Sequence, residues 1–149
     1  MSFSHLDAFE RPRMVDVGDK PLSHRIARAE GFISLHADTV EKIRGSQIRK
    51  GNVLVTAELA GVMAAKQTQN LIPLCHTLNL TKVHVEALLE ANGVRILSDV
   101  RCTGQTGVEM EALTAVSVAL LTIYDMCKAV DKNMELQQVR LIEKTKQEC

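Results

Sequence analysis

The sequence predicts an α+β fold in which helices cover one face of an antiparallel sheet. Two stretches of alternating apolar and polar residues meet at Asn92-Gly93, a dipeptide typical of tight hairpins. A third alternating stretch lies near the start, and a long uncharged segment, residues 112–124, follows the hairpin. The resulting order is strand, helix, strand, strand, helix, strand. This is the β-α-β-β-α-β layout of a ferredoxin-like sandwich, with an extra helix after the first strand.

The N-terminal part is predicted to contain an arm and a strand. Residues 1–13 are polar, with mixed charge and a proline, so a flexible arm is expected there, followed by a single domain over residues 14–149. Residues 23–36 alternate, with Ala27 and Ile33 on one face and charged residues on the other. This pattern is typical of a half-buried strand.

Two helices are expected next. Asp38 or Thr39 is expected to cap a short helix over residues 40–45. An alanine-rich helix is predicted over residues 53–68. Its small residues are Ala57, Ala60, Gly61, Ala64 and Ala65. They either serve ordinary packing within the chain or let another backbone approach closely.

The rest of the chain supplies a loop, a hairpin, the long helix and a last strand. The loop is expected over residues 70–78, and the hairpin strands over 80–91 and 94–102. A polar turn at 103–107 precedes the helix, and the last strand is predicted over 134–143. One sheet face should be covered by helices, and the other should stay open unless a partner covers it.

Composition excludes several classes of protein. The 149 residues contain 18 Lys plus Arg and 18 Asp plus Glu, so no net charge points to nucleic acid or to a membrane surface. The uncharged segment is shorter than the roughly 20 residues of a membrane span. The first residues lack the apolar core of a secretion signal. The chain has four cysteines: Cys75, Cys102, Cys127 and Cys149. They show no C-x-x-C spacing and are expected to be thiols of a cytosolic protein.

Candidate chemistry lies at the two ends of the long helix. At its start, free backbone N–H groups and the helix dipole favour an anion such as phosphate. Glu109 and Glu111 fall in this first turn, where acids are also common simply as partners of the dipole. At the other end, Asp125 and Lys128 are three positions apart and share a helix face. They are either a surface ion pair or a pair for proton transfer in a partly desolvated space.

Two further candidates lie outside this helix. His76 follows Cys75 in a loop that contains a proline, where a single histidine is more often structural than catalytic. Lys50 precedes Gly51 in a basic turn, so it could bind phosphate or remain a solvated surface lysine.

Three blocks of the sequence resemble one family. LIPLCHTL, RKGNVLVTAELAGVMAAK and TGQTGVEMEALTAVSVALLTIYDMCKAVDK are similar to signature blocks of the MoaC family, the cyclic pyranopterin monophosphate synthases of molybdenum cofactor biosynthesis. MVDVGDK and HRIARAEG also fit, and the resemblance extends over about residues 14–143. Where many members have a glycine-rich SGGKSG-like segment, this sequence reads KTKQEC, in which Lys144 and Lys146 supply positive charge.

The resemblance implies a reaction. The family is ferredoxin-like and converts (8S)-3′,8-cyclo-7,8-dihydroguanosine 5′-triphosphate to cyclic pyranopterin monophosphate, releasing diphosphate. The resemblance makes Asp125 the catalytic aspartate, with Lys50 and Lys128 as essential lysines. The positions matching the family's substrate-lining residues are Leu74, Cys75, His76, Glu109, Met110 and Glu111. No dedicated cofactor or metal ligand set is expected, and Mg²⁺ would enter only with the substrate triphosphate.

The family also implies a homohexamer, a trimer of dimers, and helix geometry agrees with a site shared between chains. Glu111 and Asp125 are 14 positions apart, so on one helix their Cα atoms lie about 21 Å from each other. An antiparallel pair of chains would bring them together, although an extended triphosphate along one helix is an alternative. Two rival functions are a non-catalytic nucleotide-binding module and a different nucleotide-processing lyase or hydrolase. Neither a partner nucleic acid nor a membrane is expected, and the protein should be cytoplasmic.

Overall fold

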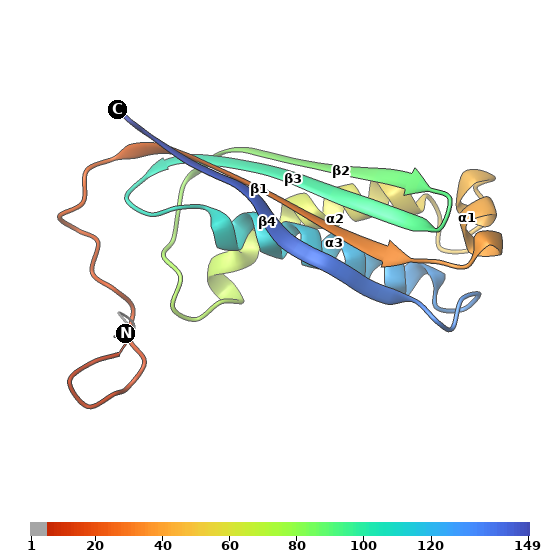
Figure 1. The fold of residues 1–149 in the computed structure, drawn as a ribbon, viewed down its shortest axis with the longest axis horizontal. Helices are drawn as coiled ribbons and strands as arrows, with labels where there is room; N and C mark the ends of the chain where they lie inside the picture. The colour runs from red at the N-terminus through yellow and green to blue at the C-terminus, as the bar shows by residue number, and fades with distance from the viewer. Residues whose placement is uncertain (1–5) are drawn as a thin grey trace.

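The computed structural model describes residues 6–149 and forms a sandwich of one sheet and one helical layer (Figure 1). The strands lie in the order β2-β3-β1-β4, and every neighbouring pair is antiparallel. This is ferredoxin-like topology and confirms the predicted fold class. The elements are β1 (Ser23–Ser34), α1 (Ala37–Arg44), α2 (Val53–Gln67), the 3-10 turn η1 (Thr68–Asn70), β2 (Leu80–Glu90), β3 (Gly93–Gly104), α3 (Glu109–Cys127) and β4 (Glu135–Glu148).

The predicted arm is a loop in its described part. Residues 1–5 lie outside the described residues, and Figure 1 shows residues 6–13 extending away from the sandwich. An antiparallel bridge joins Leu6 to Pro12. The carboxylate of Asp7 accepts hydrogen bonds from the backbone N–H groups of Phe9 and Arg11. Local hydrogen bonds therefore shape this loop.

The central strand β1 has the two faces that its alternation predicts. Ala27 and Ile33 are fully buried against the helices, whereas Arg28 lies on the open face. The edge strand β4 continues to Glu148, beyond its predicted end at residue 143, and pairs with β1 as far as Ser23. The sequence gives no periodic signal there because both faces of this end of the strand are exposed.

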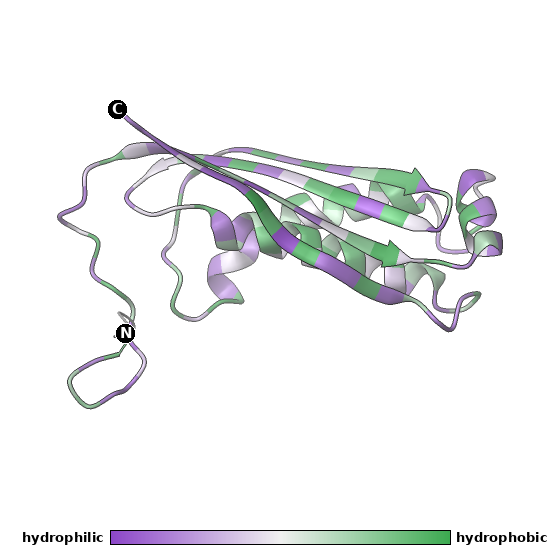
Figure 2. Ribbon diagram, viewed as in Figure 1, coloured by the Kyte–Doolittle hydropathy of each residue, from purple (hydrophilic) through white to green (hydrophobic). Residues whose placement is uncertain are grey.

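Helix α3 is the core element of the helical layer. By length and composition alone it would suffice to cross a membrane, so the prediction that it is too short for a span is wrong. Its apolar residues instead pack against the sheet and α2, and Val116 and Leu120 reach the sheet at Gly31. Figure 2 shows apolar residues along both long helices and polar residues over much of β4. The composition of α3 is that of a buried core helix.

The small residues of α2 serve this packing. A Cβ on Gly61 would lie 3.0 Å from the carbonyl oxygen of Ala115 in α3. Ala57, Ala64 and Ala65 are also buried. Gly61 therefore allows α2 to approach α3 of the same chain, and the buried alanines pack within the chain.

The cap of α1 differs from the prediction. The helix begins at Ala37, and its N-cap is His36, whose Nδ1 accepts a hydrogen bond from the N–H of Asp38 at 3.4 Å. The hydroxyl of Thr39 instead donates to Asp131, a buried carboxylate that also accepts from the N–H of His36. Burial acts to raise the pKa of Asp131, but these hydrogen bonds outweigh it and lower the pKa. Thr39 thus ties α1 to the segment before β4.

The open face of the sheet is lined by paired charges. Asp99 on β3 lies 3.0 Å from both Arg28 and Arg101. The hydrogen bond from Arg101 is the largest influence on the carboxyl, and together with Arg28 it overcomes burial to lower the pKa of Asp99 to about 2. In residues 6–149, no helix covers this face, as the sequence predicts (Figure 1).

The hairpin forms where Asn92-Gly93 predicts it, but the glycine serves another purpose. The residues Ala91 and Asn92 make the turn, and β3 begins at Gly93 without a positive φ. A Cβ on Gly93 would overlap the backbone carbonyl of Ile33 in β1. The glycine is therefore required for close contact between neighbouring strands.

We predict that Gly93→Ala lowers the free energy of unfolding by about 2 kcal/mol, because backbone must move to admit the methyl group. The measurement is urea unfolding followed by circular dichroism. Gly45→Ala is the control, since a Cβ there meets its nearest atom at an ordinary 3.4 Å, and a change within about 0.5 kcal/mol is expected. Equal stability of the two variants would contradict this explanation.

Candidate active site

The predicted site residues form two groups, one at each end of α3. The first surrounds the start of the helix and includes the loop that follows η1. The second surrounds the last turn, where Lys50 approaches from the segment before α2. Since α3 is one unbroken helix between Glu109 and Cys127, the predicted separation of about 21 Å between Glu111 and Asp125 holds within one chain.

The first group lines a single pocket, here called the Glu111 pocket, with a volume of ≈ 310 Å³. All of the residues matched to substrate-lining positions contribute to it. The other lining residues come from the segment before β1, from the turn before α3 and, for Leu78, from the loop before β2. The complete lining is Val15, Val17, Lys20, Leu74, Cys75, His76, Leu78, Thr106, Gly107, Glu109, Met110 and Glu111.

Glu111 is the buried acid of this pocket. Its side chain lies in the first turn of α3, and the residue is only 4% exposed. Burial raises the pKa of its carboxyl, its own backbone N–H acts against this, and the charge of Glu109 adds to the rise. A carboxyl with a raised pKa exchanges protons closer to neutral pH than an ordinary one does.

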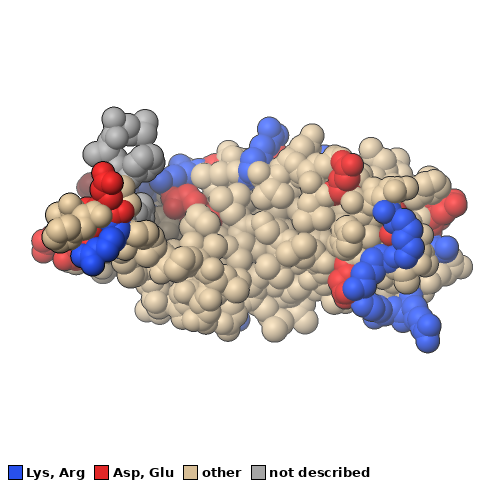
Figure 3. Space-filling model, turned by 90° about the horizontal axis from the view of Figure 1, so that it is seen from below, with Lys and Arg blue, Asp and Glu red and all other residues tan. Residues whose placement is uncertain are grey.

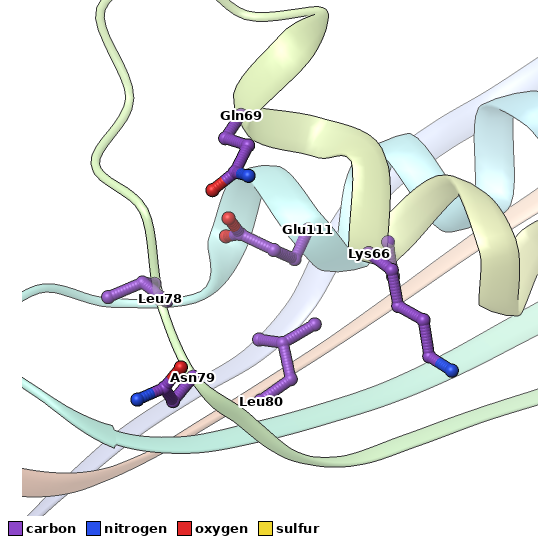
Figure 4. Close-up of a pocket in the computed structure, with 7 residues that line it drawn as sticks. Lys66, Gln69, Leu78, Asn79, Leu80 and Glu111 are labelled. Atoms are coloured by element: carbon purple, nitrogen blue, oxygen red, sulfur yellow. The ribbon is translucent and has the colours of Figure 1, made fainter.

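Glu111 also borders an adjoining pocket of ≈ 440 Å³. Figure 4 shows the carboxyl of Glu111 facing the amide of Gln69, with Asn79 and Leu80 on the neighbouring chain segment. Amides offer both donors and acceptors, as the edge of a purine or pterin base does. The buried carboxyl thus lies between two cavities that differ in the polar groups they present.

Cys75 and His76 come to the pocket from the loop after η1. The thiol of Cys75 donates a weak hydrogen bond to the carbonyl oxygen of Thr68 at 3.8 Å. Burial, reinforced by the charge of Glu111, raises the pKa of this thiol. A raised pKa disfavours the thiolate form that a covalent nucleophile needs.

Glu109 pairs with a lysine of the extended edge strand. Lys144 on β4 lies 2.9 Å from Glu109. The segment KTKQE thus continues the sheet and brings positive charge to the Glu111 pocket, as expected for Lys144. Sequence reasoning missed Val15, Val17 and Lys20, although MVDVGDK was among the matching blocks and could have indicated them.

The second group is an ion-paired cluster, here called the Lys–Asp–Lys cluster. The carboxylate of Asp125 is 2.8 Å from the ammonium of Lys50 and 3.1 Å from that of Lys128. The hydrogen bond from Lys50, followed by that from Lys128, lowers the pKa of Asp125. The shared face of Asp125 and Lys128 is confirmed. All three side chains are about half exposed, so within the described chain the cluster itself is not desolvated.

No metal site is visible in the part of the chain that the structure describes. Among residues 6–149, no three His, Cys, Asp or Glu side chains are arranged to hold a metal ion. The lysines near the predicted site residues can bind phosphate directly as point charges.

The pKa values of Glu111 and Asp125 are shifted in opposite directions. Such a pair of carboxyls, with a histidine and several lysines nearby, suits an enzyme that moves protons on an anionic small molecule. The comparisons with known proteins make this class specific. The model of the MoaC family matches residues 14–147, so the chain belongs to the MoaC family.

Curated relatives are similar over almost their whole length. The chain is 56% identical over 146 residues to the cyclic pyranopterin monophosphate synthase of Methylobacterium sp. (strain 4-46), covering 97% of this chain and 91% of the relative. Identity to the protein of the same name from Desulfitobacterium hafniense is 53%, with coverage of 97% and 90%. For Chloroflexus aurantiacus the identity is 54%, with coverage of 95% and 88%.

We predict that iodoacetamide at pH 7.5 modifies Cys149 on the order of tenfold faster than Cys75, because Cys149 is exposed and burial suppresses the thiolate of Cys75. Peptide mass spectrometry over time gives both rates. A Cys75 that reacts as fast as Cys149, or a substrate adduct on Cys75, would show that its thiol is activated.

Proposed function

We propose that this protein is a cyclic pyranopterin monophosphate synthase, a lyase of molybdenum cofactor biosynthesis. It would convert (8S)-3′,8-cyclo-7,8-dihydroguanosine 5′-triphosphate to cyclic pyranopterin monophosphate and diphosphate. The observation that carries the proposal is that the residues matched to substrate-lining positions converge on the Glu111 pocket from two segments distant in sequence. The relatives that bear this enzyme name cover nearly the whole chain.

The residues suit the reaction. Opening the five-membered ring and rebuilding it as a pterin requires several proton transfers, for which Glu111, His76 and the Lys–Asp–Lys cluster offer acids and bases. The triphosphate and the departing diphosphate are strongly anionic. Lys50 and Lys128 would bind these phosphates or donate protons to them.

We further propose that each complete site is built from two chains. Within one chain the Lys–Asp–Lys cluster is too far from the Glu111 pocket to act on the same reacting base. Two chains related by a two-fold axis across their helical layers would run antiparallel, so the cluster of one would approach the pocket of the other. This arrangement also removes water from the half-exposed cluster. Three such dimers would form the homohexamer that the family resemblance implies.

The outer surface of the helical layer supports this pairing. Figure 3 shows that this face is almost free of charge over its middle, with Lys and Arg gathered at the end where α3 terminates. Large apolar side chains are exposed on it. They are Val55 at 57%, Leu59 at 60% and Met63 at 59% on α2, with Leu121 at 55% and Tyr124 at 39% on α3. Exposed apolar patches of this kind are typical of association surfaces.

We also place the enzyme in the cytoplasm, as a reducing compartment suits its four free cysteines. The rival class, a non-catalytic nucleotide-binding module, would not need Asp125 and Lys128 together. A binding module should tolerate Lys128→Ala without losing a ligand-dependent activity, and a cyclase should not.

We predict that Asp125→Ala, Lys128→Ala and Lys50→Ala each reduce turnover by about 100-fold or more, because each removes a proton-transfer or phosphate-binding group. The assay supplies the enzymatically generated cyclised GTP intermediate and detects the pterin product and diphosphate. Since the three side chains are about half exposed, stability should change by only about 0.5 kcal/mol.

The control for these variants is Lys82→Ala, which removes a lysine from the open sheet face. It should retain turnover. Wild-type turnover in Asp125→Ala or Lys128→Ala, with an unchanged circular dichroism spectrum, would refute the assignment of this cluster.

We predict that mixing Glu111→Ala and Lys128→Ala subunits partly restores activity. Each variant alone is expected to be inactive, and a hybrid dimer contains one site with both native residues. The subunits are dissociated, mixed and reassociated, and native mass spectrometry verifies the exchange. If hybrids form and no activity returns, the site lies within one chain, and the substrate would have to extend along α3.

A further inference from the structure

A segment before β1, residues 14–21 and here called the strap, borders the Glu111 pocket. Two side chains hold its backbone in place. The imidazole Nε2 of His76 is hydrogen-bonded to the carbonyl oxygen of Val15. The amide nitrogen of Gln105 donates to the carbonyl oxygens of Gly18 and Lys20, at 3.2 and 3.1 Å. Both anchors come from loops next to the pocket, so the strap is fixed along most of its length.

The contact with Val15 determines which nitrogen of His76 carries a proton. A backbone carbonyl oxygen only accepts hydrogen bonds, so Nε2 must be the donor. In the neutral imidazole, Nδ1 is then the nitrogen without a proton. The strap therefore leaves Nδ1 as the basic nitrogen of His76.

Lys20 gives the strap a second role. It is the only Lys or Arg among the lining residues of the Glu111 pocket that the structure describes. Within residues 6–149 its ammonium makes no ion pair, whereas the nearby Glu109 is paired with Lys144. Two acidic side chains in this pocket would repel a phosphate. An uncommitted ammonium at its wall would offset that repulsion and bind a phosphate oxygen.

We propose that the strap is part of the substrate site, in which Lys20 binds a phosphate group of the substrate and the Val15 carbonyl holds His76 as the Nε2–H tautomer. This inference rests on the proposed function and adds a substrate-binding residue to the positions matched to the family's site. It also gives a role to the MVDVGDK block.

The first test compares Lys20→Met with Lys20→Arg and with Lys82→Met, a matched loss of one lysine on the open sheet face. Lys20→Met should raise KM about tenfold with a smaller effect on kcat, as expected for a lost phosphate contact. Inhibition by diphosphate should weaken by a similar factor, and Lys20→Arg should restore both values. If Lys20→Met behaves like Lys82→Met, Lys20 does not bind phosphate.

A second test asks whether Gln105 acts through the strap. Gln105→Ala removes the anchor and should raise KM, while the double variant with Lys20→Met should be little worse than either single variant. Such non-additivity is expected when two residues serve one contact. Fully additive effects on KM would show that Gln105 does not position Lys20.

Two readouts do not depend on turnover. Nitrogen chemical shifts of His76 in the full-length protein should show the Nε2–H tautomer, and an Nδ1–H form would overturn the role of Val15. Calorimetry with inorganic tripolyphosphate should show about tenfold weaker binding to Lys20→Met than to Lys82→Met. If the wild type fails to turn over the cyclised substrate, the proposed function is wrong, yet these measurements still decide the inference. If turnover is normal and tripolyphosphate binds both variants equally, the inference alone is wrong.

Discussion

The burial of α3 between the sheet and α2 is the constraint on which the rest of the structure depends. Its apolar residues form the centre of the core, and Gly31 and Gly61 allow the neighbouring elements to approach it closely. A buried helix without interruption is a rigid spacer of about 1.5 Å per residue. The same burial that stabilises the fold therefore holds the titratable groups at its two ends apart.

The two ends of α3 place carboxyls in opposite environments. Glu111 is buried beside another acid, which raises its pKa, whereas Asp125 lies between two ammonium groups, which lower its pKa. Groups with pKa values displaced in opposite directions are suited to donate and to accept protons at one pH. In the proposed two-chain site, a second chain brings both carboxyls to one substrate, and the apolar outer surface of the helical layer would accommodate that chain.

Binding of an anionic substrate next to Glu109 and Glu111 requires compensating positive charge. Lys144 arrives on the edge strand β4, and Lys20 arrives on the strap. Neither residue belongs to α3 or to the loop after η1, so the electrostatics of the pocket depend on segments near both ends of the chain. In the proposed mode of binding, the sheet edge and the strap would therefore act together with the motifs that line the pocket.

The sequence by itself determined the order of the elements, the buried face of β1 and the clustering of titratable side chains at both ends of α3. These features follow from local periodicity, from turn residues such as Asn92-Gly93, and from motif blocks specific enough to identify the family. The cap predicted for α1 was wrong. The hydroxyl of Thr39 donates a hydrogen bond to Asp131, a residue far along the chain that local sequence does not reveal.

Only the tertiary structure decided which residues meet. Lys50 could be a solvated turn lysine by sequence, yet it lies 2.8 Å from Asp125 because the start of α2 packs beside the end of α3. The strap and the end of β4 carry no periodic signal, and hydrogen bonds and ion pairs to residues distant in sequence hold them in place. Local patterns encode local structure, whereas contacts across the chain depend on the packing of the whole domain. The same packing places Lys20 at the Glu111 pocket.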